Sequence, residues 1–363
     1  MSFLLLSFTV SLLSTLAVLR SSDRHGGLSA DSEITGPQKF HNHPVPRVGG
    51  VGVLLAVFAG TLLAQFTRPA LSESLWLLLA SALPAFLGGL AEDLTKKVSA
   101  SQRLIAAVIS AGLAVWLLEA VVRHTAIPGV DPLIRLEPFA IALTLLVVTG
   151  VSNSVNIIDG FNGLASMCVL IMLMALAYVA LQVQDRLVLT AALIAAGAVL
   201  GFFVWNFPGG LIFLGDGGAY LLGFMVAELG VMLIVRNAAV SPLFPLLMCA
   251  YPIFETLFSM YRRKVLKGVA SSQPDGIHMH TLVHRRLVRQ MIRETATNRL
   301  TARNSMTSPY LWLLCSLSVI PAVLWWQNTA VLTGFLALFM VSYVVLYWRI
   351  VRFRVPKWLL PNR

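Results

Sequence analysis

Long runs of apolar residues, separated by short polar connections, fill almost the whole chain. A helix of about 20 residues spans the hydrocarbon core of a bilayer, so a window of that length divides the runs into candidate spans. The pattern predicts eleven such helices, at residues 2–20, 49–66, 75–91, 104–122, 138–152, 164–182, 187–205, 218–235, 242–260, 309–326 and 331–348. The fifth is short and the ninth contains three prolines and Glu255, so ten helices are the alternative count.

The composition favours a membrane protein and excludes a soluble one. Hydrophobic residues make up 57% of the 363 residues and charged residues 12%, against about 25% charged in an ordinary soluble domain. The expected fold class is therefore all-α and polytopic, with residues 1–363 forming one integral-membrane domain. The first twenty residues lack a basic start, so we expect a retained span rather than a signal peptide. The three cysteines lie in apolar runs and indicate core packing.

Positive charge is concentrated on one side of the predicted membrane protein. The net charge is +11, and 22 of the 27 Lys and Arg residues fall in alternate connections between the helices. These connections are residues 20–48, 92–103, 153–163, 206–217 and 261–308, followed by the tail from 349. By the positive-inside rule they are cytoplasmic. The N-terminus is then expected outside and the C-terminus inside.

The polar and charged residues that could take part in catalysis or ligand binding fall in the same five connections. We therefore expect these connections to form the active site. Carboxylate and carboxamide oxygens suit Mg²⁺, which takes one or two protein ligands and leaves positions for phosphate oxygens. Glycines beside Asp159 and Asp216 allow an anion to approach the backbone, and arginines and histidines bind phosphate. The set predicts a phosphoryl-transfer or diphosphate site. No Walker or Rossmann glycine pattern is present, so ATP-driven chemistry is not indicated.

Each motif also has a simpler interpretation. Glu92 and Asp93 could be solvated charges at a helix end, and Asn153 and Asn156 could join helices by hydrogen bonds. A secondary transporter is the main alternative function, with Glu119, Glu228 and Glu255 as its in-membrane carboxylates. Transporters usually have matching halves with a polar site at the midplane, and this chain shows neither pattern. An intramembrane metalloprotease lacks its His-Glu-x-x-His spacing.

Three motifs together resemble one enzyme family. They are Asn153-x-x-Asn156-x-x-Asp159-Gly-x-Asn162-Gly-Leu164, Gly215-Asp216-Gly-Gly-Ala219 and Pro274-Asp275-x-x-His278-x-His280. In this order they resemble the polyprenyl-phosphate N-acetylhexosamine-1-phosphate transferases of glycosyltransferase family 4, over about residues 37–285. Two positions depart from the family pattern. Glu92 stands where the family usually has aspartate, and Thr281 stands where a third histidine is common, a function that His284 could take over.

The resemblance implies transfer of a sugar-1-phosphate from a UDP-sugar to undecaprenyl phosphate, with release of UMP and a requirement for Mg²⁺ or Mn²⁺. The product would initiate a cell-envelope polysaccharide such as the O-antigen of lipopolysaccharide. The expected location is the bacterial inner membrane, with the active site on the cytoplasmic face. The expected partners are a UDP-N-acetylhexosamine, undecaprenyl phosphate and membrane lipids, and the chain could form a homodimer. Nucleic acid is not expected to bind.

The resemblance also assigns roles to individual residues. Asp216 and Asn156 match the metal site, and Glu92, Asp93 and Asp216 are the candidate catalytic carboxylates. The expected substrate-binding residues are Lys39, Arg103, Asn153, Asp159, Asn162, His278 and His280. The sugar is not determined: GlcNAc is the default, and GalNAc, FucNAc and QuiNAc are alternatives.

The reaction chemistry bears on the role of Asp93. A phosphate monoester has a second pKa of about 6, so the lipid phosphate is mostly a dianion at neutral pH and needs little help from a base. The larger difficulty is to bring two anions together. Asp93 is thus either a base or a residue that positions the lipid phosphate, with positioning slightly favoured. A covalent aspartyl-phosphate route is a third option.

Overall fold

A computed structural model describes residues 1–29, 45–266, 277–289 and 297–352, and ten helices in these ranges are long and apolar enough to cross a membrane. They are α1 (Ser2–Ser29), α2 (Gly49–Thr67), α3 (Pro69–Thr95), α4 (Ala100–Leu118), α6 (Glu137–Ile158), α7 (Leu164–Gln182), α8 (Arg186–Asn206), α9 (Gly215–Arg236), α14 (Thr297–Leu324) and α15 (Thr329–Val351). The shorter helices are α5 (Asp131–Ile134), α10 (Leu243–Met248), α11 (Ala250–Tyr261) and α12 (Met279–Val283), with π-helical turns η1 (Arg262–Leu266) and η2 (His284–Val288). The all-α, polytopic fold class is confirmed.

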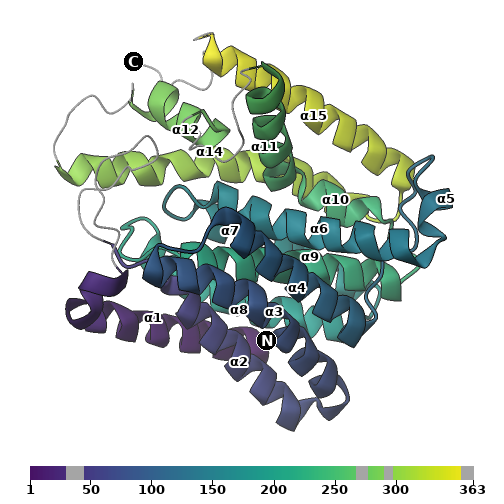
Figure 1. Cartoon of the computed structure of the whole chain (residues 1–363), viewed down its shortest axis with the longest axis horizontal. Helices are drawn as coiled ribbons and strands as arrows, with labels where there is room; N and C mark the ends of the chain where they lie inside the picture. Colours follow the sequence, from purple (N-terminus) through teal and green to yellow (C-terminus); the bar gives the residue numbers. More distant parts are fainter. Residues whose placement is uncertain (30–44, 267–276, 290–296, 353–363) are drawn as a thin grey trace.

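The ninth predicted span is not one helix. It is divided at Cys249 into α10 and α11, so the described residues give the alternative count of ten. The physical cause is the proline content that made this segment irregular in the sequence. Pro252 has no N–H to donate to the carbonyl of Met248, four residues earlier, and its ring crowds that carbonyl. The chain therefore changes course at Cys249, and α11 leaves the direction of α10 (Figure 1).

Several polar motifs that were expected in connections lie on helix ends instead. α3 continues to Thr95, α6 continues to Ile158, and α9 begins at Gly215. Polar side chains can remain helical at these ends because they find partners on neighbouring helices. Asp93, Asn156 and Asp216 consequently project from helices.

Helix α9 is the centre of the bundle. All of its residues from Gly215 to Leu233 are buried, and α2, α3, α4, α6, α7 and α8 pack around it. Figure 1 shows α9 in the middle of these helices. A helix that is apolar on nearly all sides belongs in such a position, because none of its faces needs water; beyond Asp216 in the first turn, Glu228 is the one buried carboxylate along its length. Its first turn is thereby enclosed by the ends of its neighbours.

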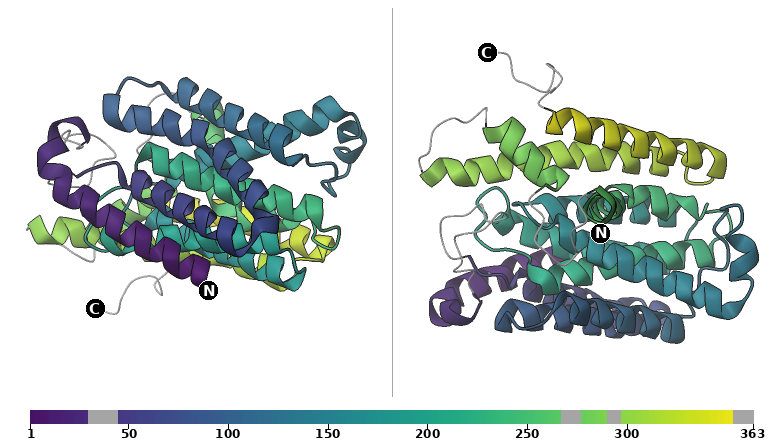
Figure 2. Two further views of the ribbon diagram at one scale, coloured as in Figure 1. Left: turned by 90° about the horizontal axis from the view of Figure 1, so that it is seen from below. Right: turned by 45° about the horizontal axis from the view of Figure 1, so that its top comes forward.

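Two outer layers flank this centre. On one side α1 packs closely along α8 and α2, and on the other α14 and α15 cover α7 and α10. The right-hand view of Figure 2 shows α14 and α15 as a layer on one side of the bundle, with α1 towards the opposite side. The last helix, α15, thus contacts α11 and α12, although it is far from both in the sequence.

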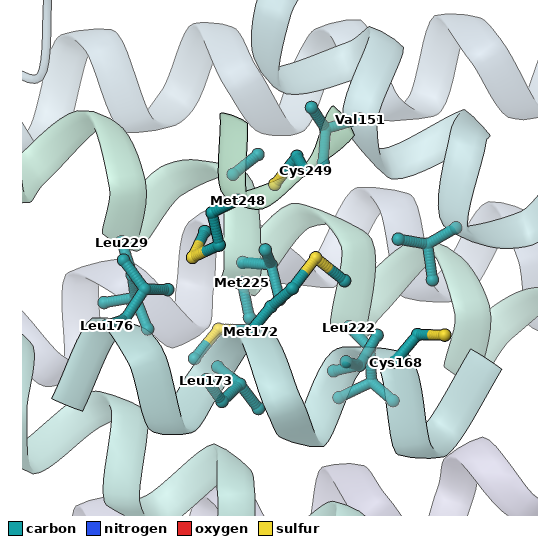
Figure 3. Close-up of a cluster of buried hydrophobic side chains, with 14 of the residues drawn as sticks. Val151, Cys168, Met172, Leu173, Leu176, Leu222, Met225, Leu229, Met248 and Cys249 are labelled. Atoms are coloured by element: carbon teal, nitrogen blue, oxygen red, sulfur yellow. The ribbon is translucent and has the colours of Figure 1, made fainter. Parts of the chain in front are cut away.

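The core beside the α10–α11 break is rich in sulfur. Figure 3 shows Met172, Met225 and Met248 together with Cys168 and Cys249 among buried leucines. Methionine is flexible and fills irregular gaps, which suits the space left where a helix is interrupted. All three cysteines are buried and none is in a disulfide, which confirms the packing role expected from the sequence.

Candidate active site

Asp216, in the first turn of α9, is the centre of a charged cluster. Its Oδ1 accepts a hydrogen bond from Asn156 Nδ2 at 3.0 Å and lies 3.2 Å from Arg47 Nη2. Its Oδ2 is paired with Arg103 Nη1. Only 6% of Asp216 is exposed. Its carboxylate is therefore largely shielded from water, and these partners replace water in stabilising its charge. The cluster joins the segment before α2 with α4, α6 and α9.

Asp93, at the end of α3, supports the same turn. Its Oδ1 accepts a hydrogen bond from the backbone N–H of Asp216 at 3.0 Å, and its Oδ2 accepts one from Gly217 N–H at 2.9 Å. The first N–H groups of a helix have no partner within the helix, and they favour a negative charge. Leu214, the N-cap of α9, provides no side-chain cap. The buried carboxylate of Asp93 therefore caps α9, and Arg47 Nε lies 3.7 Å from its Oδ1.

Two glycines allow α9 to approach these groups. A Cβ added to Gly89 of α3 would lie 2.5 Å from the backbone carbon of Asp216. Gly215 has φ +76°, and a Cβ there would lie 2.6 Å from Asp93 Oδ2. Neither distance is compatible with a side chain. The Gly-Asp-Gly-Gly motif thus serves helix packing around Asp216, in addition to any contact with an anion.

Asp159 and Gly160, directly after α6, connect this cluster to the histidine motif. Burial raises the pKa of Asp159 to about 7; the positive charge of Arg47 opposes this rise and the negative charge of Asp93 adds to it. The carboxyl of Asp159 therefore lies within electrostatic reach of both residues. A Cβ added to Gly160 would lie 3.2 Å from His280 Nε2, so the imidazole of His280 packs on this turn.

The histidines form a second, adjoining group. The rings of His278 and His280 are stacked with centroids 5.1 Å apart, and Phe161 meets the ring of His280 edge-on at 5.5 Å. His278 Nδ1 lies 2.9 Å from Glu255 Oε1. His284 lies against Phe161, with its Nδ1 3.1 Å from Thr307 Oγ1. Burial lowers the pKa of His284 to about 4, so this ring is neutral at pH 7.

Three candidate residues are engaged in contacts within the protein. Asn153 Oδ1 accepts a hydrogen bond from the hydroxyl of Tyr220 on α9 at 2.9 Å. Asn162 is 3% exposed, and its Nδ2 donates to Pro208 O at 3.2 Å, which ties the α6–α7 turn to the segment before α9. Glu92 Oε2 accepts from Val98 N–H at 2.8 Å and closes the turn between α3 and α4. Lys39, Pro274 and Asp275 lie outside the described residues.

Two residues of this region were not assigned a role in the transferase site from the sequence. Arg47 bridges Asp93 and Asp216, and its signal was its place in the Pro-Arg-x-Gly-Gly stretch that leads into α2 and resembles the first cytoplasmic loop of the family. Glu255 holds His278, and the sequence had offered it only as a carboxylate of the transporter alternative. Because Glu255 belongs to the histidine group, it is not available as one of the separate carboxylates that a transporter would need.

The described residues contain no preformed group of three or more His, Cys, Asp or Glu side chains that could hold a metal ion. The donor chemistry at Asp216 nevertheless fits Mg²⁺. This ion commonly takes one or two carboxylate or carboxamide oxygens and completes its shell with phosphate oxygens and water. Asp216 provides a carboxylate and Asn156 a carboxamide. In this structure the guanidinium groups of Arg47 and Arg103 neutralise the charge of Asp216.

Comparison with known proteins shows which family the chain resembles. The profile described as "Glycosyl transferase family 4" matches residues 75–234, which hold every member of the Asp216 cluster except Arg47. A probable undecaprenyl-phosphate N-acetylglucosaminyl 1-phosphate transferase of Bacillus subtilis is 28% identical over 285 residues, 76% of each chain. An undecaprenyl-phosphate alpha-N-acetylglucosaminyl 1-phosphate transferase of Thermotoga maritima is 30% identical over 250 residues, 69% of this chain and 72% of the relative.

A third relative uses a different lipid carrier. The decaprenyl-phosphate N-acetylglucosaminephosphotransferase of Mycobacterium leprae is 30% identical over 288 residues, 68% of this chain and 70% of its own. The similarity to these relatives thus extends over two thirds of both chains, and the family profile covers the helices that carry the charged cluster. The chain is a multi-pass membrane protein that belongs to the polyprenyl-phosphate N-acetylglucosamine-1-phosphate transferases of glycosyl transferase family 4.

Proposed function

We propose that the protein transfers an N-acetylhexosamine-1-phosphate from a UDP-sugar to undecaprenyl phosphate. An oxygen of the lipid phosphate attacks the β-phosphorus of the nucleotide sugar, a new P–O bond forms, and the bond to the α-phosphate breaks. UMP leaves with that bond's electron pair, and the lipid diphosphate sugar remains. The observation that carries the proposal is the cluster around Asp216, where two arginines and an asparagine converge beside the histidine motif.

The residues of the cluster address the main physical difficulty, the approach of two anions. Arg47 and Arg103 place two permanent positive charges at one carboxylate, where they can turn to phosphate oxygens through charge-assisted hydrogen bonds. His278 and His280 are the proposed contacts to the phosphates of the nucleotide. Asp93 has both oxygens committed to backbone N–H groups of α9, which favours a positioning role over that of a base.

A divalent cation is part of the proposal. Mg²⁺ would be held by Asp216 and Asn156, and when bound it would supply charge neutralisation for the diphosphate. The two arginines now paired with Asp216 would then be released towards the substrate phosphates. The chain's own contribution is a buried carboxylate whose position is fixed by the cap from Asp93 and by close helix packing at Gly89.

The location follows from the charge distribution. The motifs lie in, or at helix ends beside, the connections that hold 22 of the 27 Lys and Arg residues, so we place the active site and the C-terminus on the cytoplasmic side of a bacterial inner membrane. In this count α10 and α11 together take the place of the ninth span, because they lead the chain from the end of α9 back to His280, which packs on the turn at Gly160. A lipid-linked sugar made there would start a cell-envelope polysaccharide, for which O-antigen synthesis is one candidate. GlcNAc is the preferred sugar because the relatives above are named for it.

The test is release of UMP by the purified protein, given undecaprenyl phosphate and, in turn, the UDP derivatives of GlcNAc, GalNAc, FucNAc and QuiNAc. UMP release is expected with at least one donor, and removal of divalent cations by EDTA should stop it until Mg²⁺ is restored. Asp216→Ala should abolish transfer in a protein that still inserts and folds. Substantial turnover by this variant would refute the metal assignment, and absence of UMP with every donor would refute the function.

A further inference from the structure

The carboxylate of Glu255 is a buried junction between three parts of the chain. It lies on α11 and is 1% exposed. Its Oε1 lies 2.9 Å from His278 Nδ1 and accepts a hydrogen bond from Met279 N–H at 3.0 Å. Its Oε2 accepts a hydrogen bond from the hydroxyl of Tyr343 on α15 at 2.6 Å. A buried charge is tolerated only when such partners are present, so each donor matters to where the carboxylate sits.

Tyr343 is itself fixed by aromatic packing. It is fully buried, and Phe254 and Phe258 of α11 meet its ring edge-on with centroids 5.0 and 5.7 Å away. The hydroxyl therefore has little freedom to leave Glu255. A tyrosine is suited to this position because its ring fills an apolar space while its O–H reaches a polar partner.

Further hydrogen bonds join α15 to the histidine segment. The hydroxyl of Tyr347, one turn after Tyr343, donates to the carbonyl of Ile277 at 3.2 Å, and Arg262 donates to the same carbonyl and to Tyr347. Arg286, on the far side of the histidine motif, donates to the carbonyl of Ile350 near the end of α15 at 3.3 Å. The segment from Ile277 is therefore held against α15 both before and after the histidines.

This arrangement determines how His278 is oriented. Its Nδ1 is engaged by Glu255, and the ring is held parallel to His280 with an angle of 11° between the planes. In a histidine, the partner of one ring nitrogen sets the orientation of the ring and its tautomer. The position of the Glu255 carboxylate therefore determines how the imidazole of His278 is presented to a phosphate.

We propose that α15 positions His278 for the phosphates of the nucleotide sugar, with Tyr343 acting through Glu255 as the positioning residue. The inference rests on the proposed function, in which the histidines contact those phosphates. It assigns a role to a helix that lies well beyond residues 75–234, the part of the chain that the family profile matches. Tyr343 would not touch the substrate itself.

The loss of one hydrogen bond to a buried charge predicts the size of the effect. Tyr343→Phe keeps the ring contacts and removes only the O–H that Glu255 Oε2 accepts. Such a bond corresponds to about a tenfold change in an equilibrium or rate constant. We expect Kd and KM for the UDP-sugar to rise about tenfold. The change in kcat should be smaller, because His278 contributes to binding of the nucleotide sugar more than to the phosphoryl-transfer step.

A double-mutant cycle separates positioning from general destabilisation. Tyr343→Phe, His278→Ala and the double variant are compared by calorimetric Kd for UDP-GlcNAc and by kcat/KM. If Tyr343 acts through His278, its tenfold effect should shrink to within about twofold in the His278→Ala protein. Tyr251→Phe is the matched control, because Tyr251 is equally buried on α11 and its hydroxyl has no hydrogen-bond partner among the described residues. This control should match the wild type.

Each outcome decides the inference. An unchanged Kd in Tyr343→Phe, or the same tenfold loss in both backgrounds, would overturn it. If Tyr343→Phe does not fold, Glu255→Gln, which keeps the size of the side chain, replaces it in the same cycle. Failure of the proposed function is recognisable separately, since the wild type would then release no UMP with any donor, whereas failure of this inference leaves wild-type turnover intact.

Discussion

Replacement of Asp93 by asparagine tests whether this residue is a base or a support. The carboxylate is 1% exposed, and its two oxygens each accept one N–H from the first turn of α9. In Asp93→Asn, one oxygen can still accept. The amide NH₂ must then face the other backbone N–H, so two donors meet and one is left without a partner.

The cost follows from this count. Loss of a hydrogen bond to a charged acceptor, with a buried N–H left unpaired, amounts to about 3 kcal/mol. If the whole amount displaces Asp216 from Arg47 and Arg103, kcat/KM should fall about 10²-fold, since 1.4 kcal/mol is about tenfold. The melting temperature should fall as well, because the cap of α9 is weakened.

UMP release at pH 6 to 9, together with thermal unfolding in the same detergent, measures both effects. The positioning role predicts a loss of similar size at every pH. Asp185→Asn is the matched control: Asp185 caps α8 by accepting from Leu187 and Val188 N–H and pairs with Arg236, at the end of α9 remote from Asp216. It should lower the melting temperature and leave the activity of the folded protein near the wild-type value.

The opposite result is equally clear. A base is needed less as the lipid phosphate loses its second proton, at a pKa of about 6. Recovery of Asp93→Asn activity as pH rises above that value, with unchanged thermal stability, would refute the positioning role.

Substitutions at two further positions probe the same cluster. Gly89→Ala should destabilise the protein by about 1–3 kcal/mol and lower activity, because the new Cβ would lie 2.5 Å from the backbone of Asp216; Gly150→Ala, a helical glycine with nothing within 4 Å of the added atom, is the control and should behave as wild type in unfolding and UMP assays. Arg47→Lys should lower kcat/KM about tenfold and Arg47→Ala about 10²-fold, because an ammonium cannot bridge Asp93 and Asp216 as the planar guanidinium does. Equal activity of the lysine variant and the wild type would contradict that bridging role.

The membrane fold could be predicted because hydropathy is a local property. Most of the apolar runs are long enough to span the bilayer by themselves, and ten of the eleven predicted runs are single spanning helices near the predicted positions. The exception shows the limit of a composition window. The segment around Cys249 has the apolar content of a span, but Pro252 removes a backbone donor there, and the helix divides.

The motifs were visible in the sequence because their residue types and spacing are local too. Asn156, Asp159, Asp216 and the two histidines were all singled out in this way. The structure adds which of them meet: Asp216 contacts Asn156, and His280 packs on the turn at Gly160. Asn162, from the same motif, faces the protein interior.

The pairings of charge were decided only by the tertiary structure. Arg47 and Asp216 are 169 residues apart, and Asp93 lies 123 residues before the N–H that it caps. No local pattern encodes a contact between helices, since it depends on how closely two backbones approach, here through Gly89. Glu255 shows this best: by itself it was an acid in an apolar run, and its role depends on His278 and Tyr343, brought to it by separate helices.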